Sequence, residues 1–449
     1  MTADPRSDPQ AAGLQTEHDV VAVGCGPFNL GLAALSSTVD DLEVVVLEAR
    51  PKLRWHPGLM FDDATLQVSF LADLVTLVDP THPLSFLAYL RDVDRMYPFY
   101  VREQFHPTRR EYEDYLRWAA SRLPSVRFSH RVEAIRWDDG RFAVHAVRGD
   151  GARVRMLARD LVLGIGTEPA VPEALAGLPG ERLVHSEDYL HRLSELEAVG
   201  AGGMVTVVGS GQSGAEVVLD LLRRNLAGGP AVRWLTRTAS FAPLDYTKLV
   251  LEMTTPAYIR YFHTLSQGVR DRLVAAQWQH YKGISSETLE QIHDLLYQRE
   301  LQHGCADVEL RCGVAVESSH VAPSGRAVLT CRQRDTGRVF RHETDLVVAA
   351  TGYRQRHPAF LAPIEFLVRR DERGRYRVRS NHSIELDESV SCRIFVANAD
   401  LHSHGVAAPD LGIGAYRNAT ILNTITGREI YPLPKHTAFT SFEVPASTD

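Results

Sequence analysis

The clearest hydrophobic pattern near the start of the chain is a short apolar run that leads into closely spaced glycines. Residues 20–23 read Val-Val-Ala-Val and are followed by Gly24 and Gly26, then by an Ala- and Leu-rich stretch. The run predicts a buried parallel strand, and the stretch after it predicts a helix. Free N–H groups and the positive end of the helix dipole at such a turn favour pyrophosphate binding. Asn29 replaces the third glycine of the usual dinucleotide fingerprint, so this turn alone is a weak signal.

The next predicted strand, over residues 43–47, strengthens this interpretation. It ends at Glu48, which lies 24 residues after Gly24. An acidic residue at about this distance accepts hydrogen bonds from the ribose hydroxyls of a bound dinucleotide. The strands, the glycine turn and Glu48 together predict a dinucleotide-binding unit at the start of the chain.

The same pattern returns in the middle of the chain. An apolar run leads into Gly209, Gly211 and Gly214, which have the full G-x-G-x-x-G spacing. The strand predicted at 232–236 ends at Arg237, where an NAD site would carry an acid. A guanidinium at this position can pair with a 2′-phosphate, which favours NADPH, although Arg237 can also be read as an ordinary solvated residue. Two such turns predict two bound nucleotides.

The rest of the pattern places both units in one α/β architecture. Residues 126–165 alternate between apolar and polar positions and predict three or four strands, whereas residues 240–303 are aromatic and helix-rich. The predicted fold is a three-layer α/β fold with two dinucleotide-binding, Rossmann-like domains and a helical, substrate-facing insertion. The predicted boundaries are a disordered tail over 1–18, a first domain over 19–200 and 345–449, and a second domain over 201–344 with the insertion at 240–303.

Composition and charge limit which classes of molecule the protein is expected to bind. The chain of 449 residues is 44% hydrophobic, carries a formal net charge of −7 and has no long run of Lys or Arg. This balance argues against nucleic acid or an anionic membrane surface as a partner. No apolar stretch reaches transmembrane length, and the polar start has no signal-peptide core. The five cysteines have no metal-binding spacing, so we expect no metal site and a reducing, cytoplasmic setting.

Several motifs in combination resemble one family. They are GCGPFNLGLA (24–33), WHPG (55–58), LQVSF (66–70), DLVTLVDPTHPLSFLAYL (73–90), the GTEPAVP…HSEDY passage (166–189), GSGQSGAE (209–216), ATGY (350–353) and HGVAAPDLGIGAYRN (404–418). Over nearly the whole chain the sequence resembles the flavin-dependent N-hydroxylating monooxygenases, the lysine, ornithine and diamine hydroxylases that begin hydroxamate siderophore synthesis. WHPG and the C-terminal motif are the most informative, because ATGY is shared with other flavin monooxygenases.

The resemblance implies FAD and NADPH as cofactors and a small-molecule amine and O₂ as substrates. In this family NADPH reduces FAD, the reduced flavin forms a C4a-hydroperoxide with O₂, and a neutral amine attacks the distal oxygen. Because an alkylamine has a pKa of about 10.4, a desolvated site must favour its neutral form. The resemblance also implies a homo-oligomer, either a dimer or a tetramer.

The resemblance further implies which residues form the site. The expected FAD-binding residues are Gly24, Gly26, Pro27, Asn29, Glu48, Trp55, His56 and Gln67, with Thr351 and Leu411 near the isoalloxazine. The expected NADPH-binding residues are Ser210, Gln212, Ser213 and Arg237. The expected catalytic residues are Gln67, Lys282 and Asp410, with Lys282 near the nicotinamide. The expected substrate-binding residues are Ala72, Leu251 and Asp410.

Two positions depart from the amino-acid hydroxylases of the family. Ala72 stands where those enzymes typically have a Lys that binds the α-carboxylate of the substrate. A buried carboxylate without a cation is costly, so the loss of the Lys favours a substrate without a carboxylate. Asp410, at a position that is often neutral in those enzymes, offers an anion to an ammonium group. Both changes indicate an aliphatic diamine such as cadaverine or putrescine, unless Lys248 or Arg102 replaces the Lys or Asp410 only caps a helix.

Alternative functions can be compared with the sequence. An L-lysine N6-monooxygenase or L-ornithine N5-monooxygenase is the nearest alternative. A disulfide reductase would need a redox cysteine pair, and a Baeyer–Villiger enzyme would need an FxGxxxHxxxW-type motif between the turns; the sequence has neither. A nucleotide-binding sensor would bind FAD without converting an amine.

Overall fold

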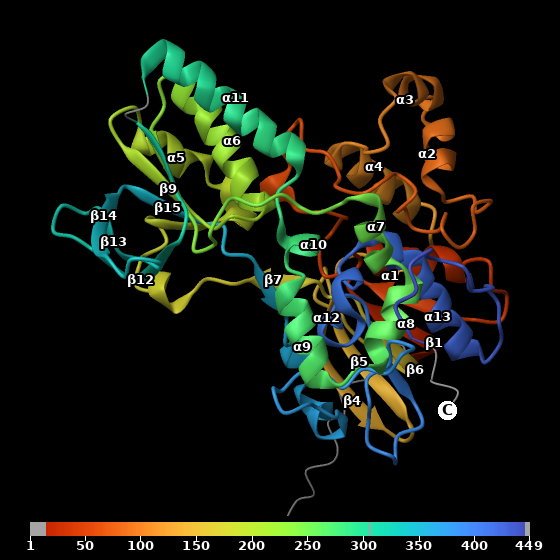
Figure 1. Ribbon diagram of the computed structural model, residues 1–449. Coiled ribbons are helices and arrows are strands. Elements are labelled where there is room, and N and C mark those ends of the chain that lie inside the picture. The colour runs from red at the N-terminus through yellow and green to blue at the C-terminus, as the bar shows by residue number, and fades with distance from the viewer. Residues whose placement is uncertain (1–14, 305–306, 445–449) are drawn as a thin grey trace, which may run out of the picture.

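Two sheets, each built around one of the glycine turns, organise the molecule (Figure 1). The structure, a computed structural model, describes residues 15–304 and 307–444. In Figure 1 the first sheet lies at the lower right and the second sheet, with its covering helices, at the upper left.

The first sheet has seven strands. They are β1 (Gln15–Val23), β2 (Val44–Leu47), β3 (Val126–Arg127), β4 (His130–Asp138), β5 (Arg141–Arg148), β6 (Arg153–Leu163) and β17 (Arg393–Val396). β1 runs parallel to β2 and β6, and β17 joins parallel to the end of β6. β4, β5 and β6 pair antiparallel, and Asp139 and Gly140 turn the chain between β4 and β5 with positive φ. The carboxyl ends of the parallel strands therefore meet beside the first glycine turn.

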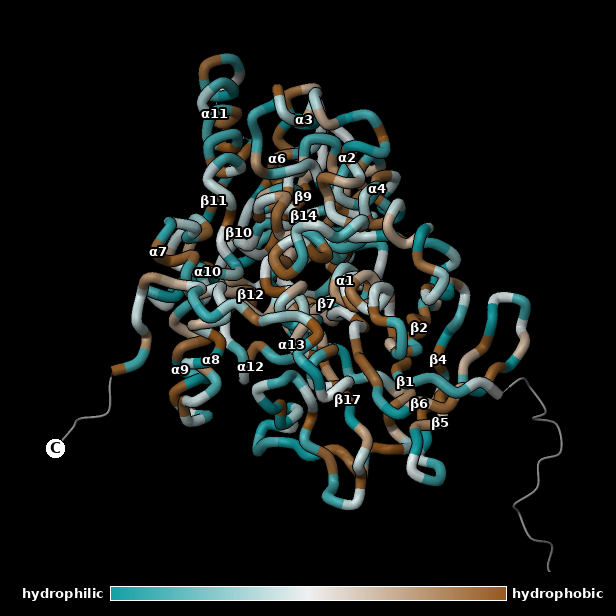
Figure 2. The backbone as a smooth tube through the Cα atoms, turned by 90° about the vertical axis from the view of Figure 1, so that its right-hand side faces the viewer, coloured by the Kyte–Doolittle hydropathy of each residue, from teal (hydrophilic) through white to brown (hydrophobic). Residues whose placement is uncertain are grey.

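Both faces of this sheet are covered, as its apolar strands predict. Val20 and Ala22 face a core shared with helices, whereas Val21 and Val23 face a core shared with β4, β5 and the 3-10 segment η5 (Ala359–Leu367). Figure 2 shows hydrophobic residues concentrated in these strands. The helices of the first domain are α1 (Pro27–Ser36), α2 (Phe86–Asp92), α3 (Met96–Arg102), α4 (Arg109–Ala120) and α13 (Gly414–Thr426).

The second sheet has five parallel strands. They are β8 (Leu183–His185), β9 (Met204–Val208), β10 (Ala231–Leu235), β11 (Val308–Arg311) and β15 (Leu346–Ala349). One face packs against α5 (Leu193–Val199), α6 (Gln212–Leu226) and α11 (Ser286–His303). The other packs against the antiparallel strands β12 (Val314–Val321), β13 (Ala327–Gln333) and β14 (Val339–Thr344).

Strand pairing places the domain boundaries elsewhere than the predicted 200 and 345. β8 and β15 pair within the second sheet, although both lie in segments that the sequence assigned to the first domain. The chain crosses between the sheets at β7 (Thr167–Pro169) and β16 (Tyr353–Gln355), which pair with each other. The sequence could not reveal this, because a short apolar strand has the same pattern in either sheet.

The start of β1 corrects the predicted tail over 1–18. Residues 15–18 already pair with β6, because backbone pairing tolerates their polar side chains; residues 1–14 lie outside the described part of the chain. Among the described residues, the structure contains no helix with the length and apolar character to cross a membrane.

The predicted insertion at 240–303 is helical, but its helices pack in two places. It contains α7 (Lys248–Leu251), α8 (Pro256–Thr264), α9 (Gln267–Ala276), α10 (Gln279–Lys282) and α11. α8 and α9 pack against α12 (Leu401–His404) and η6 (Gly405–Ala407) of the C-terminal part, whereas α11 packs on α6. The first half of the insertion thus faces the first domain, and its last helix completes the second.

Candidate active site

The first glycine turn has the open geometry that a pyrophosphate needs. Gly24 has a φ of +90°, and a Cβ there would lie 2.5 Å from the carbonyl oxygen of Gly164. Only glycine fits this position without strain. A Cβ at Gly26 would meet nothing within 4 Å, and no side chain caps the helix that starts at Pro27. The N–H groups at the start of α1 are therefore free to bind phosphate oxygens.

Asn29 fills the space that a third glycine would leave. Its Nδ2 donates to the carbonyl oxygens of Val23 at 3.1 Å and Gly24 at 2.8 Å. A Cβ at Gly164 would lie 2.4 Å from Asn29 Cγ. The close packing that usually requires glycine in the helix is here provided by Gly164 at the end of the neighbouring strand, and Asn29 ties the turn to α1.

Glu48 lies beside the same turn, at the end of β2. It accepts hydrogen bonds from the backbone N–H of Cys25 and of Arg50, each at 2.9 Å. Trp55 is partly buried, and its ring centroid lies 5.0 Å from that of His56. Glu48 therefore lies at the carboxyl edge of the first sheet, and the rings of Trp55 and His56 lie against each other a few residues further along the chain.

Leu411 and Thr351 come from late parts of the chain and have different neighbours. Leu411 packs against the apolar cluster that Trp55 also contacts. The Thr351 hydroxyl donates to the carbonyl oxygen of Ala170 at 2.7 Å, which joins the two segments that cross between the sheets. Their place beside the isoalloxazine stays a prediction.

The second glycine turn repeats the design of the first. Gly209 has a φ of +124°, and a Cβ there would lie 2.1 Å from the Ala350 carbonyl oxygen. A Cβ at Gly214 would lie 2.6 Å from the carbonyl oxygen of Gly209. Gly211 precedes α6, and no side chain caps that helix. The start of α6 is therefore a second anion-binding helix terminus.

The predicted NADPH residues surround this terminus. Ser210 Oγ lies 2.8 Å from the hydroxyl oxygen of Thr236, and Ser213 lies in the first turn of α6. A Cβ at Gly211 would lie 3.6 Å from the carbonyl oxygen of Lys282. Partial desolvation and the positive charge of Arg237 lower the pKa of Lys282. The two cations therefore lie within electrostatic reach of each other, and the backbone of Lys282 lies beside the start of α6.

Gln67 and Gln212 come from different domains and bond to each other. Gln67 Nε2 donates to Gln212 Oε1 at 3.1 Å, and the Ser285 N–H donates to the same oxygen at 2.8 Å. Gln212 Nε2 donates to Glu216 Oε1 at 2.8 Å and to Thr288 Oγ1 at 3.1 Å. The sequence placed both glutamines in cofactor sites, but their contact depends on how the domains pack.

Sequence reasoning missed Arg109, which reinforces this junction. Its guanidinium forms a bidentate pair with Glu216, with distances of 2.8 Å from Nη1 and 2.6 Å from Nη2. Nη1 also donates to the Leu59 carbonyl oxygen at 3.2 Å. The two side chains are only 14% and 8% exposed. No local signal marks this pair, because its partners lie more than a hundred residues apart in the sequence.

Ala72 and Asp410, the two departures noted in the sequence, lie at one place. A Cβ at Gly412 would lie 3.0 Å from Asp410 Oδ1 and 3.9 Å from Ala72 Cβ. Asp410 caps the 3-10 segment η7 (Leu411–Ile413), accepting the Gly412 N–H at 2.7 Å through Oδ1. The Tyr246 hydroxyl donates to Oδ2 at 3.3 Å. Burial raises the pKa of Asp410. The helix-cap alternative is therefore correct for one carboxylate oxygen, while the other faces Tyr246.

The backbone beside Ala72 is held firmly. The Asp73 carboxylate accepts hydrogen bonds from the N–H groups of Val75 at 2.9 Å, Thr76 at 2.7 Å and Phe86 at 2.7 Å. Asp73 is buried and anchors the start of α2. The backbone of residue 72 therefore has a fixed position. The chemical character of this part of the site then depends on which side chain residue 72 carries.

The cations considered as replacements for the missing Lys are both exposed. Arg102 donates to the His106 carbonyl oxygen at 3.0 Å and lines a cleft between the domains, with Gln212 and Glu287 on the far wall. Lys248 is exposed in the first turn of α7, the helix that ends at Leu251. A solvated cation binds a carboxylate far more weakly than a buried one does.

A buried cation that the sequence did not reveal, Arg417, lies close to Asp410. Its Nη2 donates to the carbonyl oxygen of Ala408 at 2.6 Å, and its Nε lies 3.9 Å from Asp400 Oδ2. Asp400 also lies 2.8 Å from His382 Nδ1. Against the effect of burial, the charge of Arg417 and the hydrogen bond of His382 lower the pKa of Asp400. Asp400 is thus the principal counter-ion of Arg417.

The same cluster contains three potential metal ligands, His382, Asp400 and His404, whose ligand atoms lie within 4.8 Å of one another. The two imidazole rings stack with centroids 4.1 Å apart, so their in-plane lone pairs do not converge on one point. Arg417 already supplies positive charge to Asp400. We therefore interpret the cluster as a charge-paired core.

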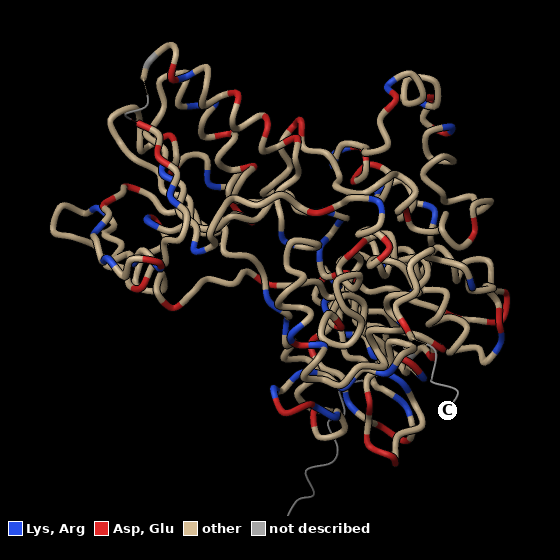
Figure 3. Tube along the Cα trace, in the orientation of Figure 1, with Lys and Arg blue, Asp and Glu red and all other residues tan. Residues whose placement is uncertain are grey.

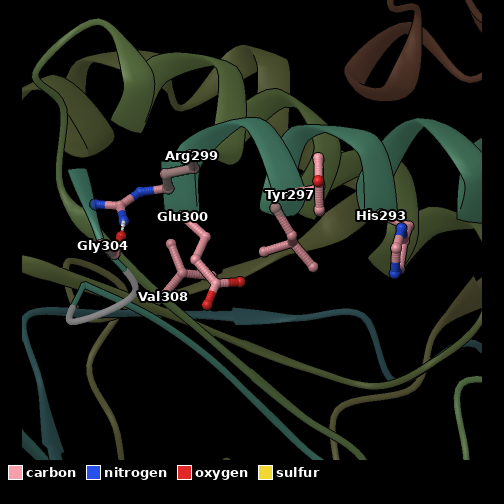
Figure 4. A pocket seen from close by; sticks show the side chains of 7 residues that line it. His293, Tyr297, Arg299, Glu300, Gly304 and Val308 are labelled. Atoms are coloured by element: carbon pink, nitrogen blue, oxygen red, sulfur yellow. Dashed lines mark hydrogen bonds between the residues drawn. The ribbon is translucent and has the colours of Figure 1, made fainter. Parts of the chain in front are cut away.

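A further shallow pocket lies at the C-terminal end of α11 (Figure 4). Arg299, on its wall, bonds to Asn225, Gly304 and Asp307. The guanidinium is therefore used by the fold, and no predicted site residue is among the described residues that line this pocket.

Comparison with known proteins places this geometry among amine monooxygenases. Residues 16–355 match the family described as L-lysine 6-monooxygenase/L-ornithine 5-monooxygenase. A putrescine N-hydroxylase of Shewanella oneidensis is 38% identical over 432 residues, which cover 95% of this chain and 84% of that protein.

Two solved structures of amine monooxygenases resemble this fold. DfoA of Erwinia amylovora, a cadaverine monooxygenase of desferrioxamine biosynthesis bound to FAD, is 41% identical with a TM-score of 0.91, covering 96% of this chain and 100% of that one. An ornithine N-hydroxylase of Kutzneria sp. 744, with reduced FAD, NADP⁺ and L-ornithine, is 27% identical with a TM-score of 0.84, covering 92% and 99%.

Proposed function

This chain belongs to the L-lysine 6-monooxygenase/L-ornithine 5-monooxygenase family, and we propose that it N-hydroxylates one primary amine of an aliphatic diamine, cadaverine or putrescine, at the first step of hydroxamate siderophore synthesis. The observation that carries this proposal is the proximity of Ala72 to the turn that holds Asp410. An uncharged methyl group and a carboxylate share the place where an amino-acid substrate would need a cation. Relatives that act on putrescine and cadaverine support the same assignment.

The charges around Asp410 favour a substrate with two amines. Burial lowers the pKa of His382 and His404, so both are neutral near pH 7. When Asp410 is ionised, Asp400, Asp410 and Arg417 together carry one net negative charge, although burial raises the pKa of Asp410. A net negative, poorly solvated region attracts an ammonium group and repels a carboxylate. The distal ammonium of a diamine can pair with Asp410 while the other amine loses its proton and reacts.

The residues at the two turns fit FAD and NADPH. The open start of α1 and Glu48 would hold FAD, and the start of α6 would hold the NADPH pyrophosphate. The bound flavin and NADPH supply the activated oxygen and the electrons; the chain orients the amine and excludes water from it. Arg237 would pair with the NADPH 2′-phosphate, and Lys282, which lies within reach of the Arg237 charge, would lie near the nicotinamide.

Product analysis tests the proposal. FAD-loaded enzyme with NADPH and O₂ is given putrescine, cadaverine, L-ornithine or L-lysine, and hydroxylamine is measured against NADPH consumed. We expect a kcat/KM for one of the diamines at least about tenfold above that for either amino acid. Preference for L-lysine or L-ornithine would overturn the diamine assignment. NADPH oxidation without hydroxylamine from any of the four amines would overturn N-hydroxylation itself.

We also propose that the enzyme is cytoplasmic and homo-oligomeric. Cys25, Cys312, Cys331 and Cys392 are free thiols, which suits a reducing compartment. Fractionation of cells of the source organism tests the location, and the mass of the purified enzyme in solution tests the assembly.

A further inference from the structure

The longest exposed stretch next to the described site runs over residues 91–106, in which every residue except Phe99 is exposed. Within it, Tyr97, Tyr100 and Val101 are 80%, 72% and 73% exposed. Figure 1 shows α2 and α3 standing away from both sheets, at the upper right. Large apolar side chains gathered on one protruding element mark an interaction surface.

These three side chains form one stripe of α3, because they are spaced three and four residues apart. Phe99 lies on the inner side of the helix, with its ring centroid 5.5 Å from those of Phe70 and Phe86. α3 has seven residues, and none of them is buried. So short a helix is marginal without packing on its apolar face. The stripe of Tyr97, Tyr100 and Val101, which we call the α3 face, therefore lacks a partner within the described part of the chain.

The charges at the rim of the α3 face favour a second copy of the chain. Residues 91–103 contain three basic and three acidic side chains, so the segment has no net charge (Figure 3). A membrane or nucleic-acid surface would select net positive charge. Asp94 precedes the helix and Arg102 ends it. Two copies of α3 packed antiparallel would bring Asp94 of one copy to the partner's Arg102, and the reverse, around a two-fold axis.

We propose that the α3 face is a self-association interface, in which Tyr97, Tyr100 and Val101 pack against the same residues of a second copy across a two-fold axis. This inference names the surface for the homo-oligomer proposed above. It is independent of the substrate, because none of these side chains is among the residues assigned to cofactor or amine.

The test measures the mass of the FAD-loaded enzyme by sedimentation velocity over a range of concentrations. Tyr97→Glu/Val101→Glu places two carboxylates at the centre of the α3 face. We expect the self-dissociation constant to rise by about 100-fold or more, because central interface residues dominate affinity. FAD content and hydroxylamine formation should stay at wild-type levels in the dissociated variant, which shows that it has folded.

A matched control is Tyr297→Glu/Leu301→Glu on α11. These side chains are also four residues apart on a helix and are 60% and 72% exposed. We expect this variant to keep the wild-type mass. Asp94→Arg should weaken association, and Asp94→Arg/Arg102→Asp should restore it, since the exchange restores opposite charges wherever Asp94 of one copy meets the partner's Arg102. A wild-type enzyme that is monomeric throughout, or an unchanged mass for Tyr97→Glu/Val101→Glu, would overturn the proposal.

Discussion

Arg109 and Glu216 form a bidentate ion pair that joins the first domain to the second. Their distances are 2.8 Å and 2.6 Å, and both side chains are largely buried. Glu216 also holds Gln212, which bonds to Gln67 of the first domain. One charged pair therefore sets the position of the second glycine turn relative to the first, and so the path between the two cofactors.

Arg109→Met should loosen this junction. Removing one partner leaves the Glu216 charge buried and unpaired, which costs about 3–5 kcal/mol. We expect NADPH-dependent flavin reduction, followed by stopped flow, to slow at least about tenfold, since a small displacement of the reacting groups has a large effect on rate. Arg109→Lys should recover little, because the bidentate geometry is lost.

The exposed pair Arg223–Asp63 provides the control for this prediction. It also links the two domains, at 2.6 Å, but its side chains are 44% and 52% exposed. Arg223→Met should change stability by at most about 1 kcal/mol and leave flavin reduction unaltered. Equal effects of the two variants would contradict the role given to Arg109.

Ala72→Lys should reverse the substrate preference. The new ammonium would originate beside Gly412 and pair with Asp410, in competition with the distal ammonium of a diamine. We expect the KM for cadaverine to rise at least about tenfold, which corresponds to roughly 1.4 kcal/mol, and turnover of L-lysine to increase. Ala72→Met, which adds similar bulk without charge, should impair both substrates. Improved diamine binding by Ala72→Lys would contradict the assignment of the site.

Diamine binding should weaken as the pH falls through the raised pKa of Asp410. Above that pKa the carboxylate is ionised and pairs with the ammonium; below it the neutral acid does not. Asp410→Asn should raise the KM by about 10- to 100-fold, the loss expected for a charged hydrogen bond, and remove this pH dependence.

Tyr246→Phe gives an independent check on the same group. The Tyr246 hydroxyl bonds to Asp410 Oδ2 and opposes the effect of burial on its pKa. Removing the hydroxyl should move the inflection of log KM against pH to a higher pH while preserving the shape of the curve. An inflection that persists in Asp410→Asn and stays at the same pH in Tyr246→Phe would mean that another group titrates.

Gly164→Ala should weaken FAD binding. The added methyl group would lie 2.4 Å from Asn29 Cγ, and overpacking of this kind costs about 1–3 kcal/mol. The expected readout is loss of the flavin absorbance that copurifies with the protein. Asn29→Gly/Gly164→Ala should recover part of it, because the clash is then removed. Gly180→Ala, where a Cβ would meet nothing within 4 Å, should behave as wild type.

The glycines and charged residues of the two turns could be found from the sequence because their requirements are local. Gly24 and Gly209 need a positive φ and a close neighbouring carbonyl. The residue at position 72 could likewise be compared with the Lys that amino-acid hydroxylases of the family typically carry there. The positive φ and the glycine spacing belong to one strand, turn and helix, a unit that keeps the same geometry wherever it occurs. The neighbouring carbonyls, of Gly164 and Ala350, come from distant parts of the chain and were supplied by the fold.

Tertiary structure alone decided how these local units meet. The contacts of Gln67 with Gln212, of Arg109 with Glu216 and of Arg417 with Asp400 join elements that are far apart or separated by turns. The assignment of β8 and β15 to the second sheet also depends on which strands lie beside them. Short apolar strands and single charged side chains carry no local signal that selects a partner. The choice is made by packing and desolvation across the whole chain, so the proximity of Ala72 to Asp410 follows from the fold and from no motif.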